Sequence, residues 1–428
     1  MGIAVFRDTA QGRELVGRLD FTIGSDALFA YDSRFVATHR SSLGISHRLP
    51  VDVAPYSEED FASFFRGLLP EGQVYADLAR TYQVPRSDYL SIIEKLGCES
   101  VGALTLVSDG VNPEEYKPRF EPLSVSALDE MRRGPLPAAV HVASETRLSL
   151  AGAQSKVAWA LAEGISADSA LESDWLVPLG TAPSSHIIKL SARGEEDIAL
   201  NELACSLMAR ACGIDAAPVS LLPFLSGAIA VERYDRIWVG EPGNRRLMRM
   251  HQEDFCQALG FAPYYKYQVE GVSYSYPAMC AALIDDACAA PRRDRVEFAK
   301  RLAFNYAVGN SDAHLKNSSL LYNEAWTSRD IAPMYDVTCI PLTGYSTRMA
   351  FDIGEHRELD DIDERDIMSI ATDCDAGLSE FDDVVREVIA GFEGFDFAIC
   401  PEPARQTAER ILENAAPRLA VLRAYLAI

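Results

Sequence analysis

The sequence predicts an α+β protein with two lobes, a mixed α/β lobe followed by a mainly helical one. Strand-like runs such as HIIKLS alternate with turns and helices in the first part of the chain. From about residue 245 onward helical patterns dominate, including RVEFAKRLAFNYAV, EFDDVVREVIAGF and ARQTAERILENAAPRLAVLRAYLA. The 428 residues, 48 % of them hydrophobic, can bury more than one core. We expect an N-terminal part over residues 1–108, the remainder of the first lobe over 109–240, and a helical lobe over 241–428.

The N-terminal part should begin with a hairpin and continue with a capped helix. The runs IAVFRD and RELVGRLDFTI flank a turn at residues 9–12. In SEEDFASFFRGLLPEG, Ser57 suits the N-cap, acidic residues follow it, and Pro70 and Gly72 end the helix. The helical spacing predicts a buried stripe formed by Phe61, Phe64, Phe65 and Leu68.

The remainder of the first lobe should contain short strands and one strong helix. Residues 109–145 are rich in Pro, Gly and charge, which predicts a connection with one short helix near residues 125–132. RLSLAGAQSKVAWAL predicts two strands around a turn of small residues, and HIIKLS and AIAVERYDRIWV predict further strands. NELACSLMARACGI predicts a helix that ends at Gly213. Its buried face should comprise Leu203, Leu207, Met208 and Ala211.

The composition argues against several classes of protein. The formal net charge of −23 disfavours autonomous binding to nucleic acid or an anionic membrane, although a basic partner could bind. The chain has no run of about 18 apolar residues and no apolar N-terminal signal, so we expect a cytoplasmic protein without a membrane span. The nine cysteines form no CxxC pair and the seven histidines no HExxH motif. Buried thiols and no structural metal are therefore expected.

The stretch VGNSDAHLKNSSLL, residues 308–321, is the first candidate for a chemical site. Asp312 and Asn317 are five residues apart in a loop that should follow a helix. Phosphoryl transfer from ATP needs a carboxylate near the acceptor hydroxyl and oxygen ligands for Mg²⁺, and one loop of protein kinases supplies both at this offset. Lys316 could neutralise phosphate charge. Because Asp and Asn are common turn residues, a solvated turn is the alternative.

A second candidate is the aspartate in IAPMYDVTC. Asp336 follows a strand-like segment, where kinases place a second carboxylate on the metal. Met334 and Tyr335 precede it and no glycine follows, so an ordinary aspartate at a strand end is the alternative.

A lysine and a glutamate of the first lobe form the third candidate. Lys189 ends the run HIIKL and could bind the α- and β-phosphates, and Glu202 follows in the first turn of a predicted helix. Kinases use such a strand–helix pair to orient the lysine. The alternative is a solvated lysine and a glutamate favoured by the helix dipole.

Two further segments could bind a nucleotide. The small residues of LSLAGAQSK would let backbone amides approach phosphate closely, although the pattern is neither GxGxxG nor a Walker sequence. AVERYDR lies where a kinase hinge would contact adenine and ribose, and an exposed strand end is the alternative. Taken together, the small-residue turn, strand lysine, helix glutamate, hinge-like strand, DxxxxN loop and strand-end aspartate follow the order found in protein kinases.

The chain resembles the HipA family of serine/threonine kinase toxins from bacterial toxin–antitoxin systems. The resemblance runs almost end to end. It is carried by FFRGLLPEG, KLGCESVGALTL, LSLAGAQSK, SHIIKLS, NELACSLMARACGI, AVERYDR, HQEDFCQALG, VGNSDAHLKNSSLL and IAPMYDV, in the family's order. The resemblance implies a two-lobed, protein-kinase-like fold.

The resemblance also implies a role for each matching residue. Asp312 would be the catalytic aspartate, with Asn317 and Asp336 binding Mg²⁺. Ser149 would be the serine on which the kinase phosphorylates itself. One departure is Ser155, which stands where the family often has the glutamate of GAQEK. The residues expected to contact ATP are Ala151, Gly152, Ala153, Gln154, Ser155, Lys156, Lys189, Glu232, Tyr234, Asp235, His314 and Lys316.

Family membership would further imply partners. A small helix-turn-helix antitoxin, similar to HipB, would bind operator DNA, and the acidic kinase would reach the DNA only through it. The substrate would be a protein such as an aminoacyl-tRNA synthetase, whose phosphorylation stalls translation. Two alternatives stay open at the level of sequence: a non-enzymatic corepressor subunit, and a kinase that acts on a small molecule or an RNA end.

Overall fold

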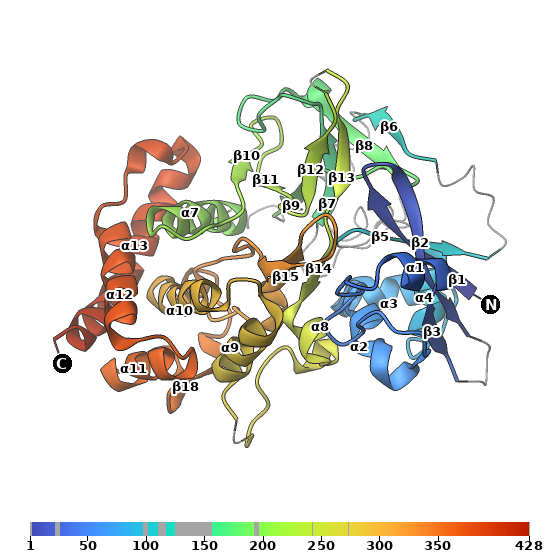
Figure 1. Cartoon of the computed structure of the whole chain (residues 1–428). Coiled ribbons are helices and arrows are strands. Elements are labelled where there is room, and N and C mark those ends of the chain that lie inside the picture. The colour runs from blue at the N-terminus through green and yellow to red at the C-terminus, as the bar shows by residue number, and fades with distance from the viewer. Residues whose placement is uncertain are drawn as a thin grey trace. The chain divides into compact units, whose positions relative to one another are not determined.

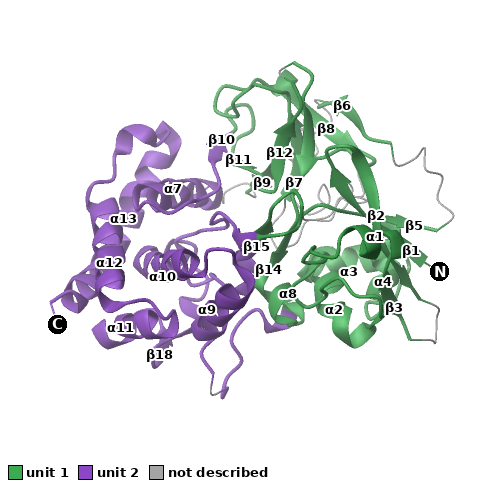
Figure 2. Ribbon diagram, in the orientation of Figure 1, with its two compact units in different colours: residues 1–194, 222–263, 321–328 green, residues 195–221, 264–320, 329–428 purple. Residues whose placement is uncertain are grey.

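The structure is a computed structural model that describes residues 2–21, 26–96, 102–109, 117–124, 156–191, 197–241, 243–272 and 274–427. The chain forms two compact units (Figure 2). Unit 1 comprises residues 1–194, 222–263 and 321–328, and unit 2 comprises residues 195–221, 264–320 and 329–428. The units are interleaved in sequence, and the predicted division into three consecutive segments stays a prediction.

The first hundred residues of unit 1 form a five-stranded antiparallel sheet with helices beside it (Figure 1). The strand order is β4-β3-β2-β1-β5, and the predicted hairpin is confirmed, because Thr9 of β1 pairs with Gly12 of β2. The elements are β1 (Gly2–Thr9), β2 (Gly12–Asp20), β3 (Leu28–Tyr31), α1 (Ser33–Thr38), β4 (Tyr56–Ser57), α2 (Glu58–Gly67), α3 (Gly72–Thr81), α4 (Tyr89–Leu96) and β5 (Leu104–Ser108).

The predicted helix after Ser57 is confirmed as α2. Ser57 is the N-cap, and its backbone N–H donates to Asp60 Oδ2 at 2.9 Å in a capping box. The predicted stripe is buried, with exposed fractions between 0 and 3 % for Phe61, Phe64, Phe65 and Leu68.

A second sheet of unit 1 is the region expected to bind nucleotide. The strands that unit 1 contributes to this sheet lie in the order β11-β9-β7-β8-β6, and Trp159 and Trp175 are buried in the core on one face. The elements are β6 (Arg119–Pro122), β7 (Lys156–Leu161), the 3-10 helix η2 (Glu172–Asp174), β8 (Trp175–Leu179), β9 (His186–Leu190) and β11 (Ala228–Glu232). A hairpin, β12 (Arg236–Val239) and β13 (Arg246–Arg249), then leads to β14 (Gln252–Asp254) and α8 (Phe255–Leu259).

Unit 2 is mainly helical. The long helix α13 packs against α7, α10, α11 and α12, and α10 also packs against α9. The helices are α7 (Asp197–Ala211), α9 (Tyr276–Ala287), α10 (Pro291–Val308), α11 (Glu364–Asp373), α12 (Leu378–Glu393) and α13 (Glu402–Tyr425). The short elements are β10 (Val219–Leu221), η4 (Leu315–Asn317), β16 (Arg329–Ile331), η5 (Ile340–Leu342), β17 (Arg348–Ile353), β18 (His356–Glu358) and η6 (Phe397–Ile399). Two elements cross the division between the units, η3 (Pro263–Tyr265) and β15 (Ser319–Tyr322).

Helix α7 corrects one detail of the sequence analysis. The helix and its end at Gly213, where φ is 71°, are as predicted, and Leu203 and Met208 are buried. Leu207 is only half-buried and Ala211 is exposed, so the predicted buried face was wrong at these two positions. Neighbouring helices cover a broader part of α7 instead, including Asn201 and Cys205.

Three further predictions concern absences and connections. The eight cysteines of the described residues are free thiols, seven of them buried. In the part of the chain that the structure describes, no helix is both long and apolar enough to cross a membrane. The helix expected near residues 125–132 lies outside the described residues.

Candidate active site

The predicted catalytic loop begins at a turn that requires glycine. Helix α10 ends at Val308, and Gly309 has a φ of 79°, in the left-handed region. A Cβ atom at Gly309 would lie 3.0 Å from Pro341 Cδ and 3.1 Å from Arg418 Nη2. The Gly309 carbonyl accepts a hydrogen bond from the Ile340 N–H at 3.1 Å. The loop therefore leaves the helix end in one defined direction.

Asp312 and Asn317 lie in one short turn of this loop. The His314 N–H donates to the Asp312 carbonyl at 2.8 Å, and the Asn317 N–H donates to the His314 carbonyl at 2.8 Å. Asn317 Nδ2 also donates to the Asp312 carbonyl at 2.9 Å. Since the amide nitrogen faces the loop backbone, Oδ1 is the atom of the Asn317 side chain that could ligate a cation.

Asp336 is tied to the same loop through its neighbour Tyr335. The Tyr335 hydroxyl donates to the Lys316 carbonyl at 2.8 Å and lies 2.7 Å from Ser319 Oγ. Asp336 itself has a φ of 60°, a left-handed conformation that is uncommon for a residue with a side chain and concentrated at functional sites. All these residues belong to unit 2, so the structure brings Asp336 and the Asp312–Asn317 turn into one assembly of loops.

His314 and Lys316 are buried, with exposed fractions of 8 and 7 %. The His314 ring packs edge-on against Tyr267, with ring centroids 5.1 Å apart. This packing favours a bracing role for His314. The predicted contacts of both residues with ATP stay a prediction.

In unit 1, two predicted phosphate ligands lie side by side. Lys156 of β7 is the register partner of Lys189 of β9, so both side chains leave the same face of the sheet. Val157 and Ile188, the next pair, point into the core on the opposite face. Lys189 is only 5 % exposed. This pairing brings two positively charged side chains to one face of the sheet.

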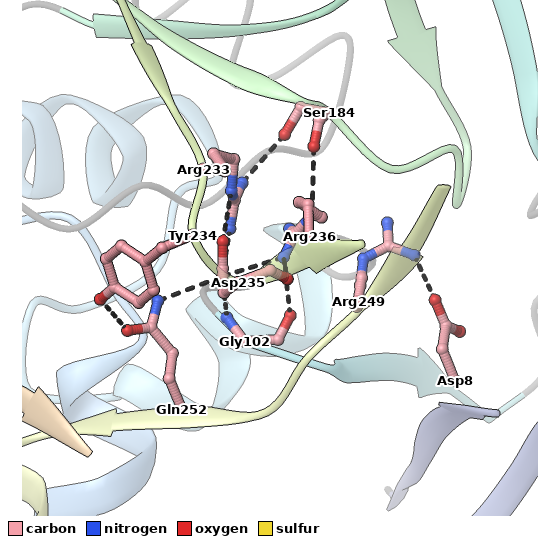
Figure 3. A network of polar contacts seen from close by, with 9 residues as sticks. All are labelled: Asp8, Gly102, Ser184, Arg233, Tyr234, Asp235, Arg236, Arg249 and Gln252. Carbon is pink, nitrogen blue, oxygen red and sulfur yellow. Dashed lines mark hydrogen bonds and ion pairs between the residues drawn. The ribbon is translucent and has the colours of Figure 1, made fainter. Parts of the chain in front are cut away.

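The segment expected to be the hinge leads from an exposed residue into a buried network of charges (Figure 3). Glu232 ends β11 and is exposed, whereas Asp235 is 2 % exposed. The Asp235 carboxylate accepts from Arg233 Nε at 2.9 Å and Nη2 at 2.8 Å, and lies 2.9 Å from Arg236 Nη1. Tyr234 is half-buried, and its hydroxyl donates to Gln252 Oε1.

This network also includes the N-terminal part of the chain. The Gly102 N–H donates to Asp235 Oδ2 at 2.9 Å, and Arg236 Nη1 donates to the Gly102 carbonyl at 3.3 Å. Gly102 has a φ of 80°, and a Cβ atom there would lie 3.0 Å from the Gln252 nitrogen. Beside it, Arg249 forms an ion pair with Asp8 at 2.8 Å (Figure 3).

The ionisation of Asp235 follows from these contacts. Burial alone would raise the pKa of its carboxyl group, but the Arg233 and Arg236 cations and the Gly102 hydrogen bond hold it well below its usual range. Protein groups therefore contact both oxygens of the Asp235 carboxylate. This environment suits a residue that braces the hinge, and the predicted contact of Asp235 with ATP stays a prediction.

The predicted site residues fall into two sets. Lys156, Lys189, Glu232, Tyr234 and Asp235 belong to unit 1, and Asp312, His314, Lys316, Asn317 and Asp336 belong to unit 2. Glu202, the expected partner of Lys189, is a buried residue of α7 in unit 2, and that pairing stays a prediction. Ser149 and residues 151–155 lie outside the described residues.

The side chains around Asp312 are compatible with Mg²⁺. Among the described residues, no group of three or more His, Cys, Asp or Glu side chains could hold a metal ion. Mg²⁺ in phosphoryl transfer is usually bound by one or two protein oxygen ligands together with substrate phosphates, not by an all-protein cage. The side chains of Asn317 and Asp336 carry oxygen atoms of this kind, in loops that the Tyr335 hydroxyl connects, and their binding of Mg²⁺ stays a prediction.

Several residues of these sites were missed by the sequence analysis. Tyr335 was noted only as a departure from the kinase pattern, yet its hydroxyl ties Asp336 to the loop. Gly102, Arg236 and Gln252 lie in segments that carry the resemblance, but no role was predicted for them, and Gly102 and Gln252 contact Asp235 from positions distant in sequence.

This two-unit fold, with a DxxxxN loop and a second aspartate tied to it, defines a protein of the two-lobed, kinase-like class. The family model described as HipA-like C-terminal domain matches residues 148–394, and that described as HipA N-terminal domain matches residues 8–107. The chain belongs to the HipA family. The predicted family is thereby confirmed.

Individual relatives agree with this assignment. A candidate kinase of Sinorhizobium fredii, Y4mE, is 32 % identical over 378 residues, which cover 85 % of this chain and 84 % of that protein. The serine/threonine-protein kinase toxin HipA of Shewanella oneidensis is 26 % identical over 352 residues, 77 % of this chain and 74 % of that protein. These relatives support a kinase.

A solved structure supports the fold class. A chain of the Shewanella oneidensis MR-1 toxin–antitoxin complex of HipA, HipB and operator DNA matches with a TM-score of 0.78 and 21 % identity. The match covers 100 % of this chain and 99 % of that chain. The predicted two-lobed α+β fold is confirmed.

Proposed function

We propose that the chain is an ATP- and Mg²⁺-dependent serine/threonine protein kinase that acts as the toxin of a toxin–antitoxin pair. The observation that carries the proposal is the Asp312–Asn317 turn, with Asp336 connected to it through the Tyr335 hydroxyl, in a member of the HipA family. The paired lysines of β7 and β9 support binding of a nucleotide triphosphate.

In the proposed mechanism, Asp312 orients the acceptor hydroxyl and takes its proton as the acceptor oxygen bonds to the γ-phosphorus of ATP and the bond to the leaving ADP breaks. Lys156 and Lys189 bind the phosphates and offset their charge, while Glu232 and Tyr234 contact the adenine. Asn317 and Asp336 would hold Mg²⁺, which offsets charge on the transferred phosphoryl group when bound. Asp235 stabilises the hinge through its ion pairs with Arg233 and Arg236.

The proposed partners follow from the charge and the relatives. A HipB-like helix-turn-helix antitoxin would bind the chain and carry it to operator DNA, so that contact with DNA is indirect. The net charge of −23 supports this arrangement, as does the solved relative, which is in complex with HipB and operator DNA. The proposed substrate is a translation protein such as an aminoacyl-tRNA synthetase.

Ser149 is the proposed site of self-inactivation. A phosphate on Ser149 would add about −1.5 to −2 charges to the loop that should bind ATP phosphates, and would repel the nucleotide. Mass spectrometry after incubation with ATP tests this step, because phosphate on Ser155 but not on Ser149 would contradict it.

Comparison of wild type with Asp312→Gln tests the kinase itself. We expect wild type to transfer the labelled γ-phosphate of ATP to itself and to proteins of a cell lysate, and Asp312→Gln to bind ATP but transfer none. Asp383→Asn, at a 71 % exposed side chain of α12, is the matched control and should keep full transfer. Equal transfer by wild type and Asp312→Gln would contradict the assignment of Asp312. A wild type that labels neither itself nor a lysate protein would favour the corepressor role.

A further inference from the structure

A tyrosine of unit 2 contacts the predicted catalytic carboxylate directly. The Tyr267 hydroxyl donates a hydrogen bond to Asp312 Oδ1 at 2.5 Å. Of the hydrogen bonds found between described residues, this is the one that the Asp312 carboxylate accepts. The Tyr267 side chain comes from the segment between α8 and α9, which is 45 residues away in sequence. No motif in the sequence indicates this contact.

The residues on both sides of Tyr267 are anchored within unit 2. The Lys266 carbonyl accepts from the Leu315 N–H at 3.2 Å, which joins the tyrosine segment to the catalytic loop itself. On the other side, Gln268 Nε2 donates to Asp352 Oδ2 at 2.7 Å and Gln268 Oε1 accepts from the Asp352 N–H at 3.0 Å. Tyr267 is therefore presented by a fixed segment.

The aromatic ring is also oriented. Its centroid lies 5.1 Å from that of the buried His314, with the planes at 81°, and 5.3 Å from the Lys266 ammonium group. Edge-on aromatic contact and cation–π attraction both favour this ring position. One end of the ring is thus packed on the catalytic loop while the side chain as a whole stays 42 % exposed.

We propose that Tyr267 is a positioning residue for phosphoryl transfer, which holds Asp312 Oδ1 and leaves Oδ2 to receive the hydrogen bond of the acceptor hydroxyl. This inference rests on the proposed kinase function. A carboxylate on an exposed turn can rotate about its terminal bond, and a donor fixed by the fold restricts that rotation. Orientation of a catalytic group before reaction raises the rate of the chemical step without strengthening nucleotide binding.

The experiment compares wild type with Tyr267→Phe, which keeps the ring and removes only the hydroxyl. The probe is the rate constant for transfer of labelled γ-phosphate to the chain itself and to dephosphorylated casein at saturating ATP. We expect this rate constant to fall roughly tenfold, as for loss of one hydrogen bond to a charged group. The ATP concentration at half-saturation and the thermal unfolding midpoint should not change, which separates positioning from a general structural defect.

Tyr345→Phe is the matched control, because Tyr345 is another exposed tyrosine of unit 2 and its side chain is not assigned to the site. It should transfer at the wild-type rate. An unchanged rate in Tyr267→Phe would overturn the inference. A faster rate would also overturn it, since the Tyr267 hydroxyl would then occupy the position on Asp312 that the acceptor hydroxyl needs, and the acceptor would have to displace it. If wild type labels neither itself, casein nor any lysate protein, the proposed kinase function fails, and with it the inference.

Discussion

The carboxylate of Asp235 lies 2.8 Å from Nη2 of Arg233, and neither side chain is more than 3 % exposed. Breaking a buried pair of this kind leaves an uncompensated charge. Removing one partner typically costs about 3–5 kcal/mol. We therefore expect Asp235→Asn to lower the free energy of unfolding by roughly 3 kcal/mol, measured by denaturant titration.

The control for this variant is Asp109→Asn. Asp109 pairs with Arg18 at 2.7 Å, but both side chains are about half exposed, so its loss should cost less than about 1 kcal/mol. A bracing role also predicts that Asp235→Asn leaves unchanged the ratio of affinities for ATP and 2′-deoxy-ATP. A change in that ratio would instead indicate contact with ribose.

The paired lysines should govern affinity for phosphate. We expect Lys189→Gln to raise the dissociation constant for ATP by at least tenfold and to leave that for adenosine unchanged, because the cation acts on the phosphates. Lys95→Gln, at an exposed position of α4, is the control and should change neither constant. Equal losses for ATP and adenosine would show that Lys189 supports the fold of the sheet rather than the phosphates.

Asp336 should determine the requirement for Mg²⁺. We expect Asp336→Asn to raise the Mg²⁺ concentration at half-maximal phosphotransfer at least tenfold, because a neutral amide is a weaker ligand than a carboxylate. The melting temperature should stay close to that of wild type, since asparagine also tolerates the left-handed backbone. Asp375→Asn is the control, because Asp375 has a φ of 46° and an 82 % exposed side chain. If both variants keep the wild-type Mg²⁺ dependence, Asp336 is not a metal ligand.

His186 should make the sheet that contains β9 sensitive to acid. Burial lowers the pKa of His186 to about 4, and its Nδ1 lies 2.8 Å from Ser185 Oγ. Because the pKa of His186 is lower in the folded chain than in the unfolded chain, His186 becomes protonated in the unfolded chain at a higher pH. The stability from neutral His186 is thus complete above about pH 6.5 and is lost toward pH 4, by roughly 3 kcal/mol.

Urea titrations at several pH values check this expectation. His186→Asn, which keeps a polar side chain but does not titrate here, should reduce the loss of stability between pH 6.5 and 4. His356→Gln is the control of opposite sign. A hydrogen bond to Asp366 raises the pKa of His356, so its contribution is present at low pH and disappears as the pH rises.

Local signals in the sequence predicted much of the fold. The Ser57 cap, the phenylalanine stripe of α2 and the glycine that ends α7 each depend on residues within one or two turns of helix. The partial error at Leu207 and Ala211 has a different origin. Which side of a helix is buried depends on the neighbours that pack against it, and those neighbours are not encoded in the helix's own periodicity.

In the candidate site, too, the features that depend on nearby residues could be predicted and the contacts between distant residues could not. Asp312 and Asn317 could be recognised because their spacing is local. The contacts that hold the site are not local: Gly102 and Asp235 are 133 residues apart, and Tyr267 and Asp312 are 45 apart. Asp235 belongs to a hinge-like motif that could be recognised, but the two arginines, the glutamine and the backbone N–H around its carboxylate could not be predicted as its partners.

The hydrogen bond between Gly102 and Asp235 bears on whether the N-terminal stretch of this chain could be replaced by that of a relative. Two family models match separate stretches of the chain, as though the N-terminal stretch were a detachable module. Yet Arg236 donates to the Gly102 carbonyl and Arg249 pairs with Asp8. The guanidinium groups of both arginines therefore contact residues of the first stretch. A truncated chain that begins after residue 108 would leave these guanidinium groups without those partners. We therefore expect a chimaera of this chain to keep these contacts only if its donor supplies a matching glycine and aspartate.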